Sequence, residues 1–478
     1  MMNLQQAARW LPGCTLVGDA ATPVQRVHSD SRSLQPGDLF VAIRGDNFDG
    51  NRFLAQARAA GAAAALAHDA DALRAAGLSG LVVADTRAAL GQLATRWREQ
   101  FSLPLIAVTG SNGKTTVTQM LASILQHWMP GAALATQGNF NNDIGLPLTL
   151  LRLRAEHRVA AVELGMNHPG EIALLAAMAQ PTVALINNAQ REHLEFMATV
   201  EAVARENGAV IDSLSATGTA VFPHDDGFAP LWRSRAGARV CLSFAIGSPP
   251  PVDGGSAADI RAQPPRWHDG AWQVRADTPA GLLAFALPMA GLHNVHNALA
   301  AASCAIAAGA PLTAVVAGLQ AFEPVKGRSR TRLLDCDGRA RTLVDDSYNA
   351  NPDSVDAALE MLAMLPAPRL MVLGDMGEVG DEGPQFHAQA GARAHALGIE
   401  HLFTLGDLSA HAARSFPGAR HFDAMPELIA AVTAHLPLVD SVLVKGSRFM
   451  RMERVVDALE SRADASGTGA TTGEAACC

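Results

Sequence analysis

The feature that most constrains this chain is a glycine-flanked loop, Thr109-Gly-Ser-Asn-Gly-Lys-Thr-Thr116, between an apolar β-type run and an amphipathic segment. A strand, a glycine loop and a helix in this order can surround a polyphosphate with backbone N–H groups and a helix N-terminus. In that arrangement Lys114 meets the β- and γ-phosphates, and the hydroxyl of Thr115 binds Mg²⁺. The spacing is shorter than the familiar phosphate-loop pattern, because Val108 stands where that pattern has glycine. We therefore predict a nucleotide site, with a chance turn and a surface lysine as the alternative.

Composition limits the class of protein. At 478 residues, the chain is long enough for about three domains of roughly 150 residues each. Its 49% hydrophobic and 17% charged residues are typical of a soluble globular protein with an ample core. A net charge of −9 argues against a general nucleic-acid or membrane-surface binder, although local Lys and Arg residues can still bind an anionic substrate. We therefore expect no nucleic-acid partner.

Membrane insertion and export are not expected. The N-terminus, Met-Met-Asn-Leu-Gln-Gln-Ala, lacks the basic and apolar regions of a signal peptide. The segment 298–322 carries no charge and is long enough to span a bilayer. Gly309-Ala-Pro311 interrupts it, however, so two buried helices are predicted instead. The six cysteines, at positions 14, 241, 304, 336, 477 and 478, have no metal-ligand spacing, and we interpret them as reduced thiols of a cytoplasmic protein.

Strand–helix alternation along most of the chain predicts an α/β fold with doubly wound, mainly parallel sheets. Residues 1–100 are interpreted as a small α/β domain. Phe101–Pro104 then opens a central domain that extends to residue 325 and contains the glycine loop.

The pattern changes twice further along the chain. From about 217 to 290, short strands separated by turn signals (248–251, 253–255 and 268–270) predict an antiparallel appendage to the central sheet. Pro324–Arg328 leads into a third α/β domain over residues 326–462. The Gly/Ser/Thr/Ala-rich segment 463–478 is predicted to be a disordered tail.

Polar residues follow three predicted buried strands of the central domain. Thr109, Glu163 and Asn187 each stand at the carboxyl end of a strand, where parallel sheets collect their ligands. Glu163 is the expected carboxylate for Mg²⁺, with a solvated or helix-capping acid as the alternative. Spacing alone leaves His193 open between a metal ligand and a lone loop histidine. The donor-rich segment Ser29–Arg32 is a simple turn on composition alone, with a phosphate-binding loop as the alternative.

Several stretches together resemble the Mur ligase family. They are Thr109–Thr116, Asn141-Asn-Asp-Ile-Gly145, Glu163-Leu-Gly-Met-Asn167, His193-Leu-Glu195, His293-Asn-x-x-Asn297 and Gly327-Arg328. Three more resemble the branch that uses D-alanyl-D-alanine: Asp345-Asp-Ser-Tyr-Asn-Ala-Asn-Pro352, Leu373-Gly-Asp-Met-Gly-Glu378 and Val444-Lys-Gly-Ser-Arg448. The resemblance runs through all three predicted domains in order. The Asp-Asn-Pro-Arg signature of the sibling that adds the third peptide residue is absent from the third domain.

The resemblance implies an N-terminal domain for the UDP end of a substrate, a central P-loop ATPase domain and a C-terminal Rossmann-like domain. It implies that D-alanyl-D-alanine is joined to UDP-N-acetylmuramoyl-tripeptide (UDP-MurNAc-tripeptide) through an acyl phosphate, with ATP converted to ADP and with Mg²⁺ as cofactor. The product is the UDP-MurNAc-pentapeptide precursor of peptidoglycan. A monomeric cytoplasmic enzyme is expected.

The resemblance also implies roles for individual residues. The catalytic set is Lys114, Glu163 and His193, and the metal ligands are Thr115, Glu163 and His193. The ATP contacts are Thr109, Gly110, Ser111, Asn112, Gly113, Lys114, Thr115, Thr116, Asn294, Arg328 and Asp346. The substrate contacts are Ser31, Arg32, Asn141, Asn142, Asn349, Asn351, Lys445 and Ser447. Asn349 and Asn351 are assigned either to the adenine or to the incoming amine.

One position departs from the family pattern. Many members carry a lysine after the His-Leu-Glu motif, which is carbamoylated and binds metal as a carboxylate. Here the stretch reads Val203-Ala-Arg-Glu-Asn-Gly208, which places Asn207 at the lysine. We therefore predict no carbamoyl-lysine. The Asn207 carbonyl, directly or through water, or the Glu206 carboxylate is left to hold a second metal ion.

Two other functions share parts of this pattern. A folylpolyglutamate synthetase-type or cyanophycin synthetase-type ligase shares the ATPase core, but the Ser29–Arg32 region and the Asp345–Pro352 stretch argue against both. A P-loop regulatory module that only holds nucleotide would leave Glu163, His193 and the third domain without a role. The D-alanyl-D-alanine-adding ligase is the leading hypothesis.

Overall fold

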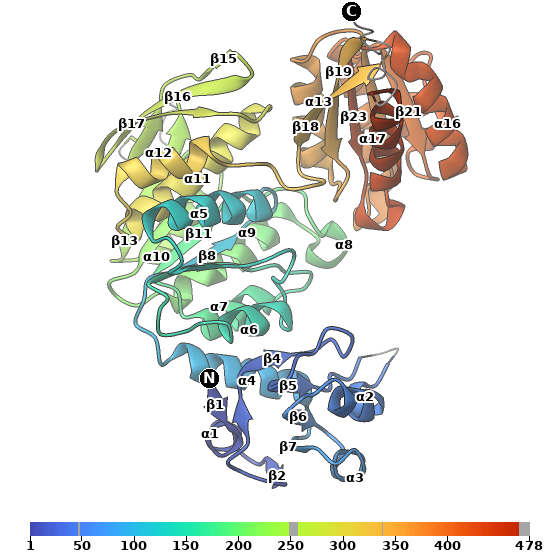
Figure 1. The fold of residues 1–478 in the computed structure, drawn as a ribbon. Coiled ribbons are helices and arrows are strands. Elements are labelled where there is room, and N and C mark those ends of the chain that lie inside the picture. Colours follow the sequence, from blue (N-terminus) through green and yellow to red (C-terminus); the bar gives the residue numbers. More distant parts are fainter. Residues whose placement is uncertain (46–47, 248–256, 337, 468–478) are drawn as a thin grey trace, which may run out of the picture.

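Three large α/β sheets, one after another along the chain, organise the molecule (Figure 1). This computed structural model describes residues 1–45, 48–247, 257–336 and 338–467. Within those ranges most neighbouring strands are parallel, and helices lie in the connections between them. The mixed α/β class that the strand–helix alternation predicts is confirmed.

The N-terminal sheet has the strand order β2-β7-β6-β5-β4, with β2 antiparallel to β7 and the other pairs parallel. The elements of this part are β1 (Met2–Asn3), α1 (Leu4–Trp10), β2 (Thr15–Val17), β3 (Pro23–Val24), β4 (Arg26–His28), β5 (Asp38–Val41), α2 (Leu54–Ala59), β6 (Ala64–Ala67), α3 (Ala70–Ala75) and β7 (Ser79–Val82). Phe40, Leu54 and Leu73 are buried together where α2 and α3 cover one face. The predicted segment Ser29–Arg32 lies in the connection between β4 and β5.

The central sheet is built around β8 (Leu105–Thr109), the strand that leads into the glycine loop. Its described strands run in the order β15-β16-β14-β13-β12-β11-β8-β10-β9, and β17 pairs with β16. Its other elements are α5 (Lys114–Trp128), β9 (Ala133–Ala135), α6 (Gly145–Leu150), β10 (Val159–Glu163), α7 (Glu171–Ala179), β11 (Val183–Ile186), α8 (Leu194–Met197), α9 (Val200–Gly208), η2 (Ala209–Ser213), β12 (Thr219–Pro223), α10 (Ala229–Ala236), β13 (Val240–Ile246), β14 (Ile260–Ala262), β15 (Arg266–His268), β16 (Ala271–Thr278), β17 (Gly281–Leu287), α11 (Leu292–Ala307) and α12 (Leu312–Gln320). Because β8 lies between β10 and β11, the ends of all three strands meet at one edge.

The antiparallel part of the central sheet is smaller than predicted. Strands β12, β13 and β14 continue the parallel sheet, and the antiparallel pairs involve β14 to β17, so the change comes near residue 266 rather than near 217. The crossover helix α10 joins β12 to β13, which is the connection that parallel strands require. The turn signals at 248–251 and 253–255 fall outside the described residues, whereas the turn at 268–270 connects β15 and β16.

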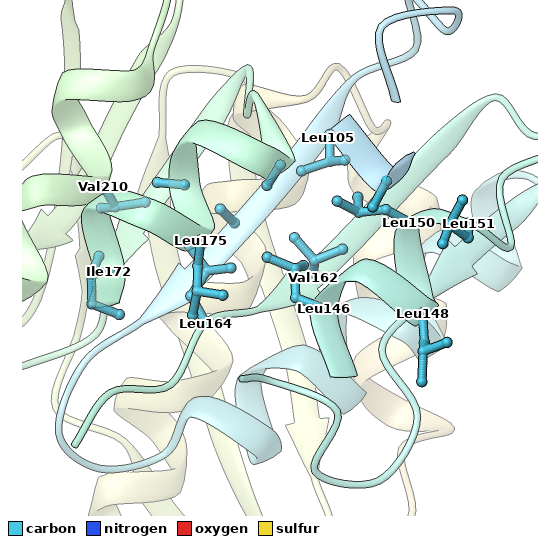
Figure 2. Packing of buried hydrophobic residues seen from close by; sticks show 14 of the residues in the cluster. Leu105, Leu146, Leu148, Leu150, Leu151, Val162, Leu164, Ile172, Leu175 and Val210 are labelled. Atoms are coloured by element: carbon cyan, nitrogen blue, oxygen red, sulfur yellow. The ribbon is translucent and has the colours of Figure 1, made fainter. Parts of the chain in front are cut away.

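Helices cover both faces of the central sheet. Helices α5, α11 and α12 pack on one face, where Ile124 and Leu299 are fully buried. Helices α6 and α7, with η2, cover the other face, and Figure 2 shows Leu105, Val162 and Leu175 converging there. The edge of the sheet between these two helix layers is left for the glycine loop.

Helix α4 (Thr86–Arg98) joins the N-terminal part to the central one. The Trp97 indole donates to the Leu153 carbonyl at 3.1 Å, and the buried Arg98 guanidinium donates to the Ala179 carbonyl at 2.9 Å. Buried residues of α4, α6 and α7 belong to one hydrophobic cluster. The boundary predicted near residue 100 therefore separates two sheets that share a core.

The C-terminal sheet has the order β18-β19-β23-β20-β21-β22, and β18 is antiparallel to β19 while the other described pairs are parallel. Its elements are β18 (Arg330–Cys336), β19 (Arg339–Asp346), α13 (Pro352–Ala363), β20 (Arg369–Gly374), α14 (Gly383–Ala396), β21 (His401–Leu405), α15 (Ala410–Arg414), β22 (Arg420–Phe422), α16 (Met425–His435), β23 (Ser441–Lys445) and α17 (Glu453–Gly467). Helices α13 and α14 pack on one face, and α16 and α17 pack on the other. The parallel register pairs Asp346 with Lys445 at the carboxyl ends of β19 and β23.

The structure also describes the uncharged segment, part of the C-terminal tail and four of the cysteines. The uncharged segment 298–322 forms the two buried helices α11 and α12, as predicted, and no described helix is long and apolar enough to cross a membrane. Helix α17 extends to Gly467, five residues into the predicted tail, and 468–478 lie outside the described residues. The described cysteines, at 14, 241, 304 and 336, are free thiols, while Cys477 and Cys478 lie outside the described part.

Candidate active site

The glycine loop between β8 and α5 requires glycine at two positions. Gly110 (φ 132°) and Gly113 (φ 83°) adopt backbone conformations that L side chains rarely take. A Cβ atom on Gly113 would lie 2.3 Å from Asn297 Oδ1 and 2.6 Å from Asn187 Nδ2. Helix α5 begins directly afterwards at Lys114, so the N–H groups of its first turn are available to an anion.

Asparagine side chains from the end of β11 hydrogen-bond to the backbone of the loop. Asn187 Nδ2 donates to the Asn112 carbonyl at 2.7 Å and to Asn297 Oδ1 at 2.9 Å. Asn188 Oδ1 accepts from the Asn112 N–H at 2.8 Å, so the two residues after β11 fix the loop backbone. The sequence places Asn187 at the carboxyl end of a strand but predicts no specific contact for it or for Asn188. The signal was their position, because β11 is a neighbour of β8 and its carboxyl end lies beside the loop.

The side chain of Lys114, the residue after the loop, folds back over the loop backbone. Its Nζ atom donates to the carbonyls of Gly110 and Ser111, at 2.6 and 3.0 Å, and to Glu192 Oε1 at 2.9 Å. The side chains of Lys114 and Glu192 are 14% and 9% exposed. A positive charge is therefore held at the centre of the loop, where a polyphosphate bound to the loop N–H groups would lie. Glu192 was not predicted as a site residue.

Glu163, at the end of β10, reaches the start of α5. Its Oε1 atom accepts from Asn141 Nδ2 at 2.7 Å and from Thr115 Oγ1 at 3.2 Å. The residue is buried, and Oε2 has no hydrogen-bond partner among the described residues. A buried carboxylate oxygen without a partner costs free energy unless a ligand satisfies it. Thr115 and Glu163, predicted to bind Mg²⁺ together, are thus brought together with a free oxygen ligand.

His193 lies between two carboxylates. Its Nε2 atom is 3.4 Å from Glu192 Oε1, and its Nδ1 atom is 2.5 Å from Glu378 Oε2 in the C-terminal domain. The residue has a left-handed backbone (φ 51°), which is uncommon for a residue other than glycine. Burial disfavours the imidazolium, but the two carboxylates outweigh it and raise the His193 pKa to about 9.

The C-terminal domain supplies cationic and anionic groups opposite the loop. The Arg328 guanidinium lies 3.9 Å from the centre of the Tyr348 ring, and its Nη2 atom is 3.4 Å from Thr115 Oγ1. Lys445 Nζ donates to Asp346 Oδ2 at 2.5 Å. Burial favours the neutral acid, but the ammonium outweighs burial and lowers the Asp346 pKa.

Direct bonds connect the two domains next to the loop. Asn351 Nδ2 donates to Asn112 Oδ1 at 3.0 Å, and the same asparagine caps α13 through a reciprocal capping box with Ser354. Arg191, in the loop after β11, donates from Nη2 to Asp353 Oδ1 at 2.7 Å. The phosphate loop and the start of α13 are therefore held at a fixed separation.

These groups line one cavity of about 680 Å³ between the central and C-terminal domains. The predicted residues that line it are Ser111, Asn112, Gly113, Lys114, Thr115, Thr116, Asn141, Asn142, Glu163, His193, Asn294, Arg328, Asp346, Asn349, Asn351 and Lys445. Lining residues for which no specific contact was predicted include Asn187, Asn188, Gln190, Glu192, Asn297 and Tyr348. The cavity thus collects residues from segments more than 300 positions apart in the sequence.

Five predicted residues do not line this cavity. Thr109 and Gly110 lie beneath the loop, and Ser447 is buried, where it donates to the Ala350 carbonyl. Ser31 and Arg32 lie in the N-terminal domain between β4 and β5, where Arg32 pairs with Asp30. Their expected contact with a uridine nucleotide stays a prediction.

Neither expected substitute for a carbamoyl-lysine reaches the cavity. Asn207 is fully buried, and its Oδ1 atom accepts from Thr109 Oγ1 at 2.6 Å and from the Gly110 N–H at 3.1 Å. Both Glu206 oxygens accept backbone N–H groups at the start of α7. Asn207 thus anchors the phosphate loop, and both side chains are committed elsewhere.

The fold and this cavity define a class: a three-domain α/β protein with a phosphate-binding loop beside a carboxylate, closed by a third domain that contributes Arg328 and Lys445 to the cavity. Three family models match the chain: the Mur ligase family catalytic domain over residues 23–98, the Mur ligase middle domain over 108–305, and the Mur ligase glutamate ligase domain over 329–448. The chain belongs to the Mur ligase family, as the motifs predict.

The chain is similar to well-described members of that family over most of its length. It is 39% identical to the UDP-N-acetylmuramoyl-tripeptide–D-alanyl-D-alanine ligase of Escherichia coli (strain K12), covering 94% of this chain and 95% of that relative. The enzyme of the same name from Bacillus subtilis (strain 168) is 33% identical, with 92% and 94% covered.

Solved structures agree with these relatives. MurF from Acinetobacter baumannii matches with a TM-score of 0.81 and 36% identity, covering 92% of this chain and 94% of that one. MurF ligase from Thermotoga maritima in complex with ADP matches with a TM-score of 0.78 and 25% identity, covering 93% and 99%.

Proposed function

We propose that this chain is an ATP-dependent ligase that joins D-alanyl-D-alanine to UDP-MurNAc-tripeptide, giving the UDP-MurNAc-pentapeptide precursor of peptidoglycan. The observation that carries the proposal is one cavity lined by the phosphate loop, the Glu163 carboxylate and Lys445 of the C-terminal domain. The chain also matches relatives of this name over nearly their whole length. No observation favours the alternative ligases or a nucleotide-holding module.

ATP is needed because a carboxylate at neutral pH is a poor electrophile. The terminal carboxylate oxygen of the tripeptide attacks the γ-phosphorus, the bond between γ-phosphorus and the bridging oxygen breaks, and ADP leaves. The amine of D-alanyl-D-alanine then attacks the acyl phosphate, loses a proton and expels inorganic phosphate. One amide bond forms for each ATP converted to ADP and phosphate.

Lys114 and the loop N–H groups stabilise the charge on the transferring phosphoryl group. The loop amides and the first turn of α5 hold the phosphates, and the Lys114 ammonium lies among them within 3.0 Å of two loop carbonyls. A nucleotide on the loop would compete with Glu192 for this ammonium. Because the loop backbone is fixed by the Asn187 and Asn188 side chains, little reorganisation of its N–H donors accompanies the transfer.

The residues at the end of β10 suit a hard divalent cation. The free Glu163 Oε2 atom and the Thr115 hydroxyl offer oxygen ligands, as Mg²⁺ prefers. The described residues contain no group of three His, Cys, Asp or Glu side chains that would hold a metal alone. That is the usual arrangement for Mg²⁺, which takes one or two protein oxygens and completes its shell with phosphate and water. When bound, Mg²⁺ neutralises charge on the phosphates.

The C-terminal domain contributes the remaining side of the reaction. Arg328 and Tyr348 stack at the hinge, in position for the nucleotide, and Asn294 in the first turn of α11 lines the same cavity. Lys445 and Asn349 line the cavity wall where the peptide end of the substrate and the incoming amine would meet. We assign Ser447 to positioning this wall, since it bonds backbone groups on either side.

The domain division at residues 100, 325 and 462, the UDP contacts at Ser31 and Arg32, a monomeric state and a cytoplasmic location belong to the same proposal. ATP, which the reaction consumes, is a cytoplasmic metabolite.

The test is phosphate release by the purified chain. The proposal expects release only when ATP, UDP-MurNAc-tripeptide and D-alanyl-D-alanine are all present, with tripeptides carrying diaminopimelate and lysine assayed side by side. Release that is indifferent to the tripeptide or to the dipeptide would reject the proposal. Lys114→Ala is the matched negative control, because it removes the loop ammonium.

A further inference from the structure

The family resemblance implies a second divalent cation, held by a histidine at the position of His193 and by a carbamoyl-lysine, and this chain has no such lysine. Lysine occurs only at positions 114, 326 and 445. Lys114 and Lys445 are bound to Glu192 and Asp346, and Lys326 is paired with Asp457. Outside the cavity, Glu206 accepts from two backbone N–H groups, and Asn207 Oδ1 accepts from the Thr109 hydroxyl and the Gly110 N–H. The negative charge that a second cation needs must therefore come from elsewhere.

We propose that Glu192 supplies this carboxylate and, together with His193, holds the second divalent cation. The residue is 7% exposed and lines the cavity. Its Oε1 atom lies 2.9 Å from Lys114 Nζ and 3.4 Å from His193 Nε2. Its Oε2 atom is buried and has no hydrogen-bond partner among the described residues.

The unpartnered oxygen is what points to a ligand. A buried carboxylate oxygen without a donor costs about 1–3 kcal/mol, and a hard cation is a natural partner for it. Among the described residues that line the cavity, Glu163 Oε2, across the phosphate loop, is the other buried carboxylate oxygen without a hydrogen-bond partner. One free oxygen on each side of the loop suits two cations that bracket the same phosphates.

The backbone explains how Glu192 and His193 reach the same cavity. His193 has φ 51°, so the chain turns sharply between the loop after β11 and helix α8. Strain of this kind persists where the surroundings hold it and is typical of ligand-binding positions. Glu378 contacts the far nitrogen of the same imidazole, which leaves Nε2 directed towards Glu192.

This inference rests on the proposed function, because a second cation is needed only where a phosphoryl group is transferred. We therefore test it by counting bound Mn²⁺ ions in the full-length chain, by the loss of the free Mn²⁺ electron paramagnetic resonance signal, with saturating AMP-PNP. The wild-type chain is expected to bind two Mn²⁺ ions. Glu192→Gln, which keeps the side-chain volume, is expected to bind one tightly and the other at least ~10-fold more weakly. Glu201→Gln is the control, since its side chain is 59% exposed on α9.

The outcomes separate the two proposals. If Glu192→Gln binds two Mn²⁺ ions as tightly as the wild type and binds AMP-PNP more tightly, Glu192 only neutralises Lys114 and the inference is overturned. If the wild type binds a single ion, the inference also fails, although nucleotide-dependent binding at Glu163 still agrees with the proposed function. Glu192→Asp keeps the charge and guards against a folding defect. It is expected to retain both ions and to weaken the second less than Gln does.

Discussion

Closure of the C-terminal domain on the phosphate loop should depend on the ion pair Arg191–Asp353, which a longer contact of Arg191 with Asp356 (3.4 Å) accompanies. The Arg191 guanidinium contacts both oxygens of Asp353, through Nη2 at 2.7 Å and Nε at 3.1 Å, and its backbone N–H donates to the same carboxylate at 2.7 Å. The two side chains are 30% and 23% exposed, so the pair is partly shielded from water. We predict that Arg191→Ala weakens nucleotide binding without contacting the nucleotide.

The magnitude follows from the geometry. Exposed ion pairs contribute about 0.2–1 kcal/mol, whereas hydrogen bonds to charged groups contribute about 1.5–3 kcal/mol. A forked, partly buried pair lies between these limits, so we expect a coupling of about 1.5 kcal/mol, or roughly tenfold in Kd. Asp353 also lies in the first turn of α13, where a carboxylate interacts favourably with the helix dipole. Asp353→Asn should therefore cost slightly more free energy than Arg191→Ala.

The assay is a double-mutant cycle on the Kd of AMP-PNP, measured by isothermal titration calorimetry. Arg191→Ala and Asp353→Asn should each raise Kd about tenfold, and the double variant should be little worse than either. Arg205→Ala is the matched control, because Arg205 pairs with Glu201 on an exposed helix face away from the cavity. Additive effects, with a coupling below about 0.3 kcal/mol, would refute the reasoning.

Three further predictions concern the loop, the histidine and the buried pair. Gly113→Ala forces a residue with a side chain into a left-handed backbone conformation (φ 83°) and should cost about 1–3 kcal/mol of stability. It should also remove AMP-PNP binding, and unchanged binding in calorimetry would contradict this prediction. Because the His193 pKa is raised to about 9 from 6.5, its stabilising contribution is complete below pH 6.5 and is lost as the pH rises through 9. Urea unfolding of wild type and His193→Gln should therefore differ by at most about 3 kcal/mol at pH 6 and converge by pH 10; a constant difference would contradict this. Lys445→Met leaves Asp346 buried without its cation and should lower the free energy of unfolding by about 3–5 kcal/mol. Adding Asp346→Asn to the same chain should restore much of this loss, and no recovery would argue against the pair.

The parts of the site that follow from local sequence were predictable. The glycine loop, Thr115 and Glu163 lie at the ends of adjacent parallel strands, and one rule, that ligands gather at the carboxyl ends of such strands, places them together. Lys445 and Asp346 became recognisable through the family motifs, and the parallel register of β19 and β23 pairs them.

The parts that depend on how domains meet were not predictable. Arg191 and Asp353 are 162 positions apart and belong to different domains, so no periodicity or spacing links them. The position of Glu192 in the site could not be predicted from local sequence either, because it depends on the contact with Lys114, whose side chain folds back over the loop. The misplaced start of the antiparallel strands has a different cause: β12 and β13 are short apolar runs, and such runs do not distinguish parallel from antiparallel pairing.

The way the cavity holds its lysines bears on which amine the enzyme acylates. An acyl phosphate reacts with any free amine nearby, and an enzyme that makes one risks acylating itself. The cavity contains two lysines, and each is engaged: Lys114 donates to two carbonyls and Glu192, and Lys445 donates to Asp346 and the Asn349 carbonyl. An ammonium bound in this way has no lone pair to attack with. In the proposed reaction, these ion pairs therefore keep both cavity lysines from competing with the dipeptide amine for the acyl phosphate.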